Sequence, residues 1–171
     1  MKCLTILFLL FSNILQAQDP DHEPKKEFDV GIGIGIDYGG IGARATFKPI
    51  SHLGLFAAAG YNFNSIGFNA GGQWHFPQKR NDFYITAMYG YNAVIAVSGD
   101  IEDKGTYYGV SAGLGYELHS RRRPNFWNFE ILVPFRNSNF KDDVDALKYL
   151  GADLMEPLPI AISIGYHFKI L

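Results

Sequence analysis

The chain has 171 residues, of which 47% are hydrophobic and 15% aromatic, and its net charge is −2. This length suits one domain, and the small net charge provides no concentrated basic face, so we do not expect nucleic acid as a partner. The single cysteine, Cys3, lies at the extreme N-terminus, which excludes a disulfide framework and a thiolate metal site from the rest of the chain.

The N-terminus has the three parts of a secretory signal peptide. Met1-Lys2 is a positive start, Cys3 to Phe11 is apolar, and Ser12 to Gln18 is polar. The apolar run is too short to cross a bilayer as a helix. We therefore predict that residues 1–17 are a cleaved signal peptide and that residues 18–27 form a polar periplasmic tail.

Beyond this tail, apolar residues recur at every second position. Val30, Ile32, Ile34 and Ile36 alternate with Gly31, Gly33, Gly35 and Asp37, and the same period recurs in eight segments. A period of two predicts β-strands with two unlike faces. The predicted strands are Phe28–Asp37, Ile41–Lys48, Leu53–Phe63, Ile66–Phe76, Phe83–Val97, Tyr107–His119, Asn125–Phe135 and Ile160–Ile170.

The composition of the two faces predicts which one points outward. The apolar face carries no charge, whereas the other face carries glycine, serine, asparagine and a few charges. Glycine is a poor choice for an exposed strand surface but suits the crowded interior of an eight-stranded barrel. We therefore predict an all-β fold, an eight-stranded antiparallel transmembrane β-barrel over residues 28–171, with lipid outside and a filled polar interior. Larger side chains are predicted to point inward at Phe56, Tyr84, Met88, Tyr107 and Phe126.

Loop lengths and aromatic residues predict an orientation. The longest connections, residues 98–105 and 136–157, would face outward, opposite the two termini. Two aromatic girdles are then expected. The periplasmic girdle comprises Phe47, Trp74, Phe76, Phe83, Tyr116, Trp127, Tyr166 and Phe168, and the outer girdle comprises Tyr61, Phe63, Phe68, Tyr108 and Phe135.

The last predicted strand carries a polar residue, a glycine and two hydrophobic residues two positions apart, at Ser163, Gly165, Phe168 and Ile170. In these residues and in its eight strands the chain resembles the small OmpA/OmpX-type barrels, porin-like outer-membrane proteins of Gram-negative bacteria. The resemblance implies residence in the outer membrane, contact with its lipid, and folding by the barrel-assembly machinery, which would read these four residues. It implies no single activity, because one fold serves many functions.

Charged residues on the inward face are the candidate functional residues. Buried charges need partners, so we predict an interior network of salt bridges in which Arg44 and Glu130 pair across the barrel. The other predicted members are Asp29, Asp37, Lys48, Glu117 and Lys169. A network of this kind fills the interior. The alternative is a gated pore whose opening exchanges these partners.

Three further patterns are weaker. Residues 40–45 match a dinucleotide-binding GxGxxA pattern, but the period of two continues through them where a cofactor site needs a helix. His75, His119 and His167 point inward, yet they lie on alternate strands, so we expect hydrogen-bonded histidines and neither metal nor cofactor. Lipid A deacylases of this size use a histidine and a serine two residues apart, and the sequence has no His-x-Ser.

The connection 136–157 carries the remaining signal. Val144, Leu147 and Leu150 recur at helical spacing, which predicts a short helix that caps the barrel or contacts an envelope or extracellular partner. Asp143-x-Asp145 lacks the rest of an EF-hand loop, so capping is favoured over calcium binding. The expected function is non-enzymatic, structural or interacting through the outer loops. The alternatives are a narrow passive channel and, second, a lipid A-modifying enzyme.

Overall fold

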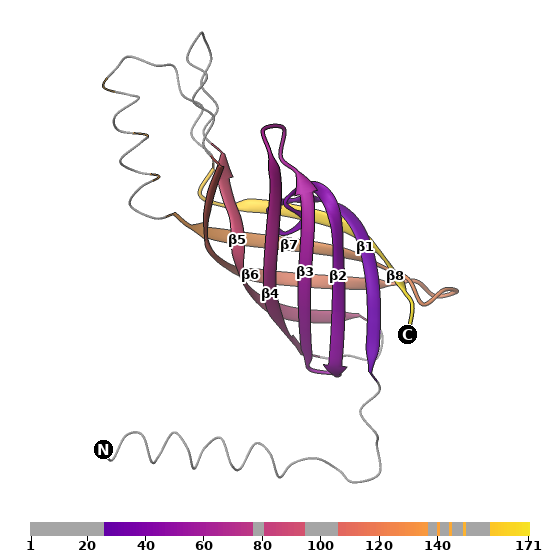
Figure 1. Cartoon of the computed structure of the whole chain (residues 1–171). Helices are drawn as coiled ribbons and strands as arrows, with labels where there is room; N and C mark the ends of the chain where they lie inside the picture. The colour runs from indigo at the N-terminus through magenta and orange to yellow at the C-terminus, as the bar shows by residue number, and fades with distance from the viewer. Residues whose placement is uncertain are drawn as a thin grey trace, which may run out of the picture.

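The computed structural model describes residues 26–76, 81–94, 106–136, 140, 144, 149 and 158–171. These residues form a closed barrel in which every strand is antiparallel to its neighbours and β1 also pairs with β8 (Figure 1). The predicted closed eight-stranded antiparallel barrel is confirmed. Its strands are β1 (Glu27–Gly35), β2 (Gly40–Ile50), β3 (Leu53–Tyr61), β4 (Ile66–Phe76), β5 (Asp82–Val94), β6 (Thr106–His119), β7 (Phe126–Phe135) and β8 (Ala161–Lys169).

The two ends of the barrel differ. β1 starts and β8 finishes at one end, which we call the terminal end, and the connections after β1, β3, β5 and β7 lie at the opposite end, the loop end (Figure 1). Residues 1–17, most of the predicted tail, and Asp143 and Asp145 lie outside the described residues. Among the residues that are described, no helix has the length and hydrophobicity needed to cross a membrane.

The predicted assignment of the two faces is confirmed by burial. On β7, buried and exposed residues alternate without exception: Phe126, Glu130 and Leu132 are buried, while Phe129 and Ile131 are exposed. The same alternation places Phe56, Tyr84 and Met88 inside, and Tyr107 is half-buried. Among the outward-facing residues of the eight strands as described, none is charged.

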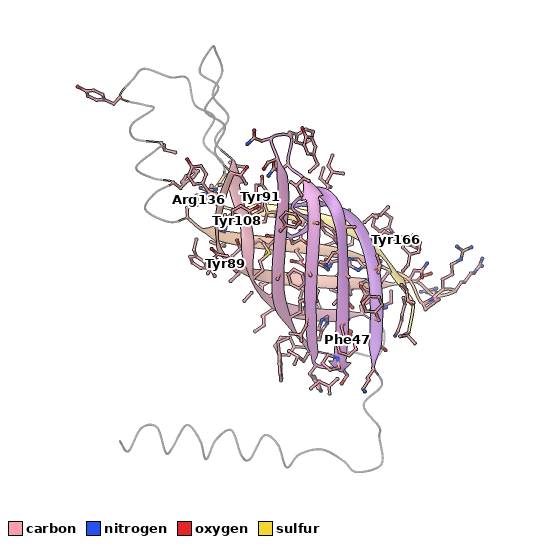
Figure 2. All side chains as sticks on the ribbon, viewed as in Figure 1. Phe47, Tyr89, Tyr91, Tyr108, Arg136 and Tyr166 are labelled. Atoms are coloured by element: carbon pink, nitrogen blue, oxygen red, sulfur yellow. The ribbon has the colours of Figure 1, made fainter. Side chains whose placement is uncertain are left out.

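Aromatic side chains lie toward both ends of this outer face. Figure 2 shows Phe47 and Tyr166 toward the terminal end, and Tyr91 and Tyr108 toward the loop end. Trp127 and Phe135, at the two ends of β7, are also exposed, and Ile131 lies midway between them. The described strands therefore carry an aliphatic belt between two groups of aromatic residues.

The predicted end of the first strand is wrong, and the difference changes the interior. The first strand was predicted to continue to Asp37, which leaves residues 38–40 as the connection to the second, but β1 ends at Gly35 and a short 3-10 helix, η1 (Ile36–Tyr38), follows. Gly35, Gly39 and Gly40 have φ values of 145°, 73° and 111°, which residues with a Cβ rarely adopt. The turn bends into the barrel, and Asp37 and Tyr38 are completely buried.

Glycines on the surrounding strands make room for η1. A Cβ on Gly33 would lie 2.6 Å from the Tyr38 ring, and a Cβ on Gly165 would collide with the same side chain. On the other side, a Cβ on Gly42 or Gly60 would collide with the backbone oxygen of Tyr38. The glycines of the interior face therefore leave space for two things, the inward-folded turn η1 and the large side chains that point inward from opposite strands. We call the space around η1 the socket.

We expect Gly33→Ala to destabilise the barrel by about 1–3 kcal/mol, because the added methyl overpacks the socket. Its Cβ would also lie 2.7 Å from the backbone oxygen of Ile164, which cannot move aside as a side chain can. Gly72→Ala is the matched control, since its Cβ would find its nearest neighbours at 3.8 and 3.9 Å. Equilibrium urea unfolding of both variants measures the difference, and equal losses would contradict the socket.

Candidate functional site: the charged interior

The centre of the interior is organised around Arg44, which is 1% exposed. Its Nη1 donates hydrogen bonds to Asp37 Oδ2, at 2.8 Å, and to Glu130 Oε1, at 2.6 Å. The guanidinium also lies 5.0 Å from the Tyr38 ring centroid and 5.1 Å from that of Phe56, within cation–π range of both. The sequence-predicted pair of Arg44 and Glu130 thus lies across the barrel between β2 and β7, with Asp37 as a third charged partner.

Neutral groups from other strands complete the environment of Glu130. Its Oε1 accepts hydrogen bonds from the Tyr84 hydroxyl at 2.6 Å and the Gln73 amide at 3.3 Å. Asn128 Nδ2 lies 3.4 Å away. Tyr84 and Gln73 were not predicted as members, because an uncharged polar residue on an inward face has no pattern that marks it as a partner of a charge. Together these residues fill the bore at mid-height.

A second charged group, the Glu117 cluster, comprises Lys48, His75, Asp82, Glu117 and His119. Lys48 Nζ lies 3.0 and 2.9 Å from the two carboxylate oxygens of Glu117, and His119 Nε2 lies 3.2 Å from Oε2. His75 Nδ1 lies 3.9 Å from Oε1. The cluster is near the terminal end, where β5 starts and β6 finishes.

A third set lies beside the central group, where His167 Nε2 is 3.4 Å from Arg44 Nη2. Asp29 Oδ1 lies 2.6 Å from His167 Nδ1, and His167 Nε2 lies 2.6 Å from the Tyr38 hydroxyl. A carboxylate, an imidazole and a hydroxyl in this order are what activates a hydroxyl nucleophile in hydrolases. Here the Tyr38 side chain is 0% exposed and enclosed by Gly33, Gly165 and Arg44, so no substrate reaches its oxygen. The arrangement fixes η1 in the barrel.

One sequence expectation needs correction. Lys169 is not a member of the buried network: it forms an ion pair with Glu27, and both side chains are about a quarter exposed at the terminal end. The three inward histidines do not gather at one point, as their positions on alternate strands predicted. Phe126 contacts the rings of both His119 and His167, with 4.9 Å between centroids in each case, and only His75 and His119 lie beside Glu117.

The four residues of the terminal-strand pattern divide between the two faces of β8 and its end. Ser163 is 1% exposed and Gly165 lies against the Tyr38 side chain, whereas Phe168 and Ile170 are exposed on the outside. The polar residue and the glycine therefore have structural roles inside the barrel. Residues 40–45 of the GxGxxA pattern all lie within β2, so no helix follows the glycines.

Two described residues of the connection that follows β7 pack at the loop end. Phe140, Val144 and Tyr149, the described residues within it, are helical. Phe140 and Val144 are buried with Ala93, and Tyr107 packs against them. The remainder of the predicted capping helix lies outside the described residues.

The chain was also compared with known proteins. No protein-family model matches it, and no curated protein is significantly similar to it in sequence.

Proposed function

We propose that the chain is an outer-membrane β-barrel of the OmpA/OmpX type with a closed interior and a non-enzymatic role, structural or interacting through its outer loops. Residues 1–17 would direct export, and the barrel-assembly machinery would insert the remainder. The terminal end then faces the periplasm and the loop end faces outward. The connection that contains Phe140 and Val144 is the largest candidate surface for an envelope or extracellular partner.

The outer face carries this proposal. Exposed aliphatic side chains such as Ile32, Leu114 and Ile162 cover it between the aromatic groups, while Arg44 and Glu130 are buried inside. A water-soluble barrel of this size would place its apolar face inward, around an oily core or ligand. An apolar exterior with a charged interior is instead the arrangement that a hydrocarbon environment favours.

The interior supports a closed barrel over an open one. The cluster around Arg44 and Glu130 and the inward turn η1 contact each other and occupy the bore together, and large side chains such as Tyr84 are buried. A narrow channel is the second candidate, because several buried polar atoms have no hydrogen-bond partner within the described part of the chain. They include Asp37 Oδ1, Thr46 Oγ1 and Gln73 Oε1, and such atoms suit a thin path of water.

Ile131→Lys tests the membrane environment directly. Ile131 is 56% exposed at the middle of β7, so in a bilayer the substitution places a charge at the mid-plane and should cost about 2–4 kcal/mol of folding free energy. Unfolding of the chain in lipid vesicles measures this cost. In a water-soluble barrel the same exposed lysine would leave the folding free energy unchanged and would improve solubility.

Tyr149→Lys is the control, because Tyr149 is 92% exposed outside the strands and should tolerate the charge. Fractionation supplies an independent readout: the chain should remain in the outer-membrane fraction after a carbonate wash. Recovery of a folded monomer from the aqueous fraction without detergent would contradict the proposal.

A further inference from the structure

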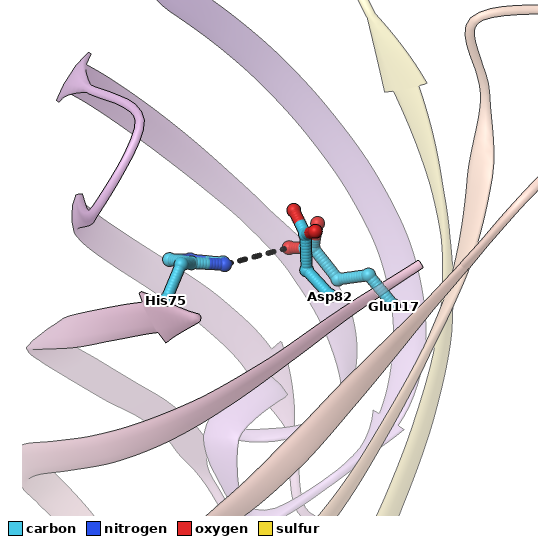
Figure 3. Close-up of side chains that lie close together, drawn as sticks. All are labelled: His75, Asp82 and Glu117. Carbon is cyan, nitrogen blue, oxygen red and sulfur yellow. Dashed lines mark ion pairs between the residues drawn. The ribbon is translucent and has the colours of Figure 1, made fainter. Parts of the chain in front are cut away.

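Three potential metal ligands meet at the terminal end of the interior. His75, Asp82 and Glu117 each offer one ligand atom, and these atoms lie within 4.8 Å of one another. The register of the sheet brings them together: Asp82 pairs with Glu117 across β5 and β6, and His75 pairs with Tyr84, two residues along β5 from Asp82. Figure 3 shows the two carboxylates side by side, with the imidazole directed toward them.

His75 is the unexplained member of this group. Its side chain is 0% exposed, and neither ring nitrogen has a hydrogen-bond partner among the described residues. This state is unfavourable for a buried imidazole, because its nitrogens have lost their hydrogen bonds to water and form none with the protein in return. Nδ1 faces Glu117 Oε1 at 3.9 Å, which is too long for a hydrogen bond and leaves space between the two atoms.

We propose that His75, Asp82 and Glu117 bind a divalent transition-metal ion of the zinc class. One imidazole nitrogen with two carboxylate oxygens is a ligand set for Zn²⁺, whereas Ca²⁺ and Mg²⁺ prefer oxygen ligands alone. Tetrahedral ligands at zinc lie about 3.3–3.5 Å apart, given bonds of roughly 2.0–2.1 Å. Binding would therefore draw the three ligand atoms, which lie within 4.8 Å of one another, closer together.

Lys48 is the internal competitor of the metal. Its ammonium lies 3.0 and 2.9 Å from the oxygens of Glu117 and so neutralises that carboxylate when no metal is bound. Metal binding therefore has to displace or share this contact. Asp82 is half-buried at the start of β5, which gives a cation in solution a route to the site from the terminal end.

The test is a calorimetric titration of the untagged chain, folded in detergent micelles, with ZnCl₂. We expect one zinc ion per chain. His75→Gln should weaken binding by more than the roughly 10–100-fold that loss of an outer-shell partner costs. Glu27→Gln is the matched control, because Glu27 is a partly exposed carboxylate at the same end of the barrel that pairs with Lys169 outside the cluster, and its loss should leave the affinity unchanged.

Lys48→Met should change the zinc affinity in the opposite direction from His75→Gln. Removal of the competing ammonium should tighten zinc binding, and zinc should raise the unfolding midpoint of this variant more than that of the wild type. Cobalt supplies a second readout, since Co²⁺ at a site with one nitrogen and two oxygen ligands gives visible absorption bands that His75→Gln should abolish.

Asp82→Asn removes a ligand at a half-buried position and keeps the test valid if His75→Gln does not fold. Binding that persists in both ligand variants would overturn the proposal. So would the absence of zinc binding to both the wild type and Lys48→Met. The outcome depends on the barrel and not on its cellular location, so it is separate from the test of the proposed function.

Discussion

Replacing Glu130 with alanine should destabilise the barrel by about 3–5 kcal/mol, the cost of removing one partner from a buried ion pair. Glu130 Oε1 accepts from Arg44 at 2.6 Å and from the Tyr84 hydroxyl at 2.6 Å, and all three side chains are buried in the bore. The variant leaves Asp37 as the one carboxylate that contacts Arg44 among the described residues, and it deprives Tyr84 of its charged acceptor. Equilibrium urea unfolding in lipid vesicles measures the loss.

Two further variants show whether charge or burial is responsible. Glu130→Gln keeps an acceptor for Tyr84 but removes the charge, so it should cost less than Glu130→Ala. Glu27→Ala breaks the partly exposed pair with Lys169 and should cost about 0–1 kcal/mol. If Glu130→Ala and Glu27→Ala lost equal stability, the central cluster would not be the electrostatic core of the barrel.

The sequence was sufficient to predict the strands and their faces because both depend on a local period. β4 has the predicted bounds, Ile66–Phe76, and the other strands differ by a few residues at their ends. The short gap between the predicted strands Leu53–Phe63 and Ile66–Phe76 implies a turn, and there Asn62 Oδ1 accepts hydrogen bonds from the backbone of Asn64 and Ser65. Such features are encoded by neighbouring residues.

The partners inside the barrel were harder to predict because they depend on the stagger between strands far apart in sequence. Alternation places Asp29 and His167 on the inward face, but only the register of β1 with β8 brings their side chains within 2.6 Å. In the same way, nothing local marks Asp82 as the neighbour of His75. The metal-site proposal therefore could not have been made from the sequence.

The inward turn η1 was missed for a related reason. Residues 36–38 continue the alternation of β1, so the local pattern predicts a strand, whereas contacts with several other strands determine their conformation. Asn69 of β4 donates to the backbone oxygen of Ile36 at 2.6 Å, and His167 of β8 contacts the Tyr38 hydroxyl. The signal that was present is the set of glycines flanking η1, whose positive φ values allow the chain to bend inward.

This turn leads to the second large expected effect. Tyr38→Ala should destabilise the barrel by about 3–5 kcal/mol, as truncation of a fully buried aromatic side chain does. It should also raise the ion conductance of the chain in planar bilayers above that of the wild type. The ring fills the bore between Gly33 and Gly165 and contacts the Arg44 guanidinium, so its removal opens space beside the central charges.

Tyr38→Phe separates the two roles of the side chain. It keeps the ring in the bore and removes only the contact between the hydroxyl and His167, so it should cost about 1–3 kcal/mol and leave conductance at the wild-type level. A wild-type chain that conducts as well as Tyr38→Ala would contradict a closed interior and favour the narrow channel. If the wild type, Tyr38→Ala and Tyr38→Phe all fail to conduct, the Arg44–Glu130 pair and not Tyr38 closes the barrel. Glu130→Ala should then conduct ions in the same bilayers.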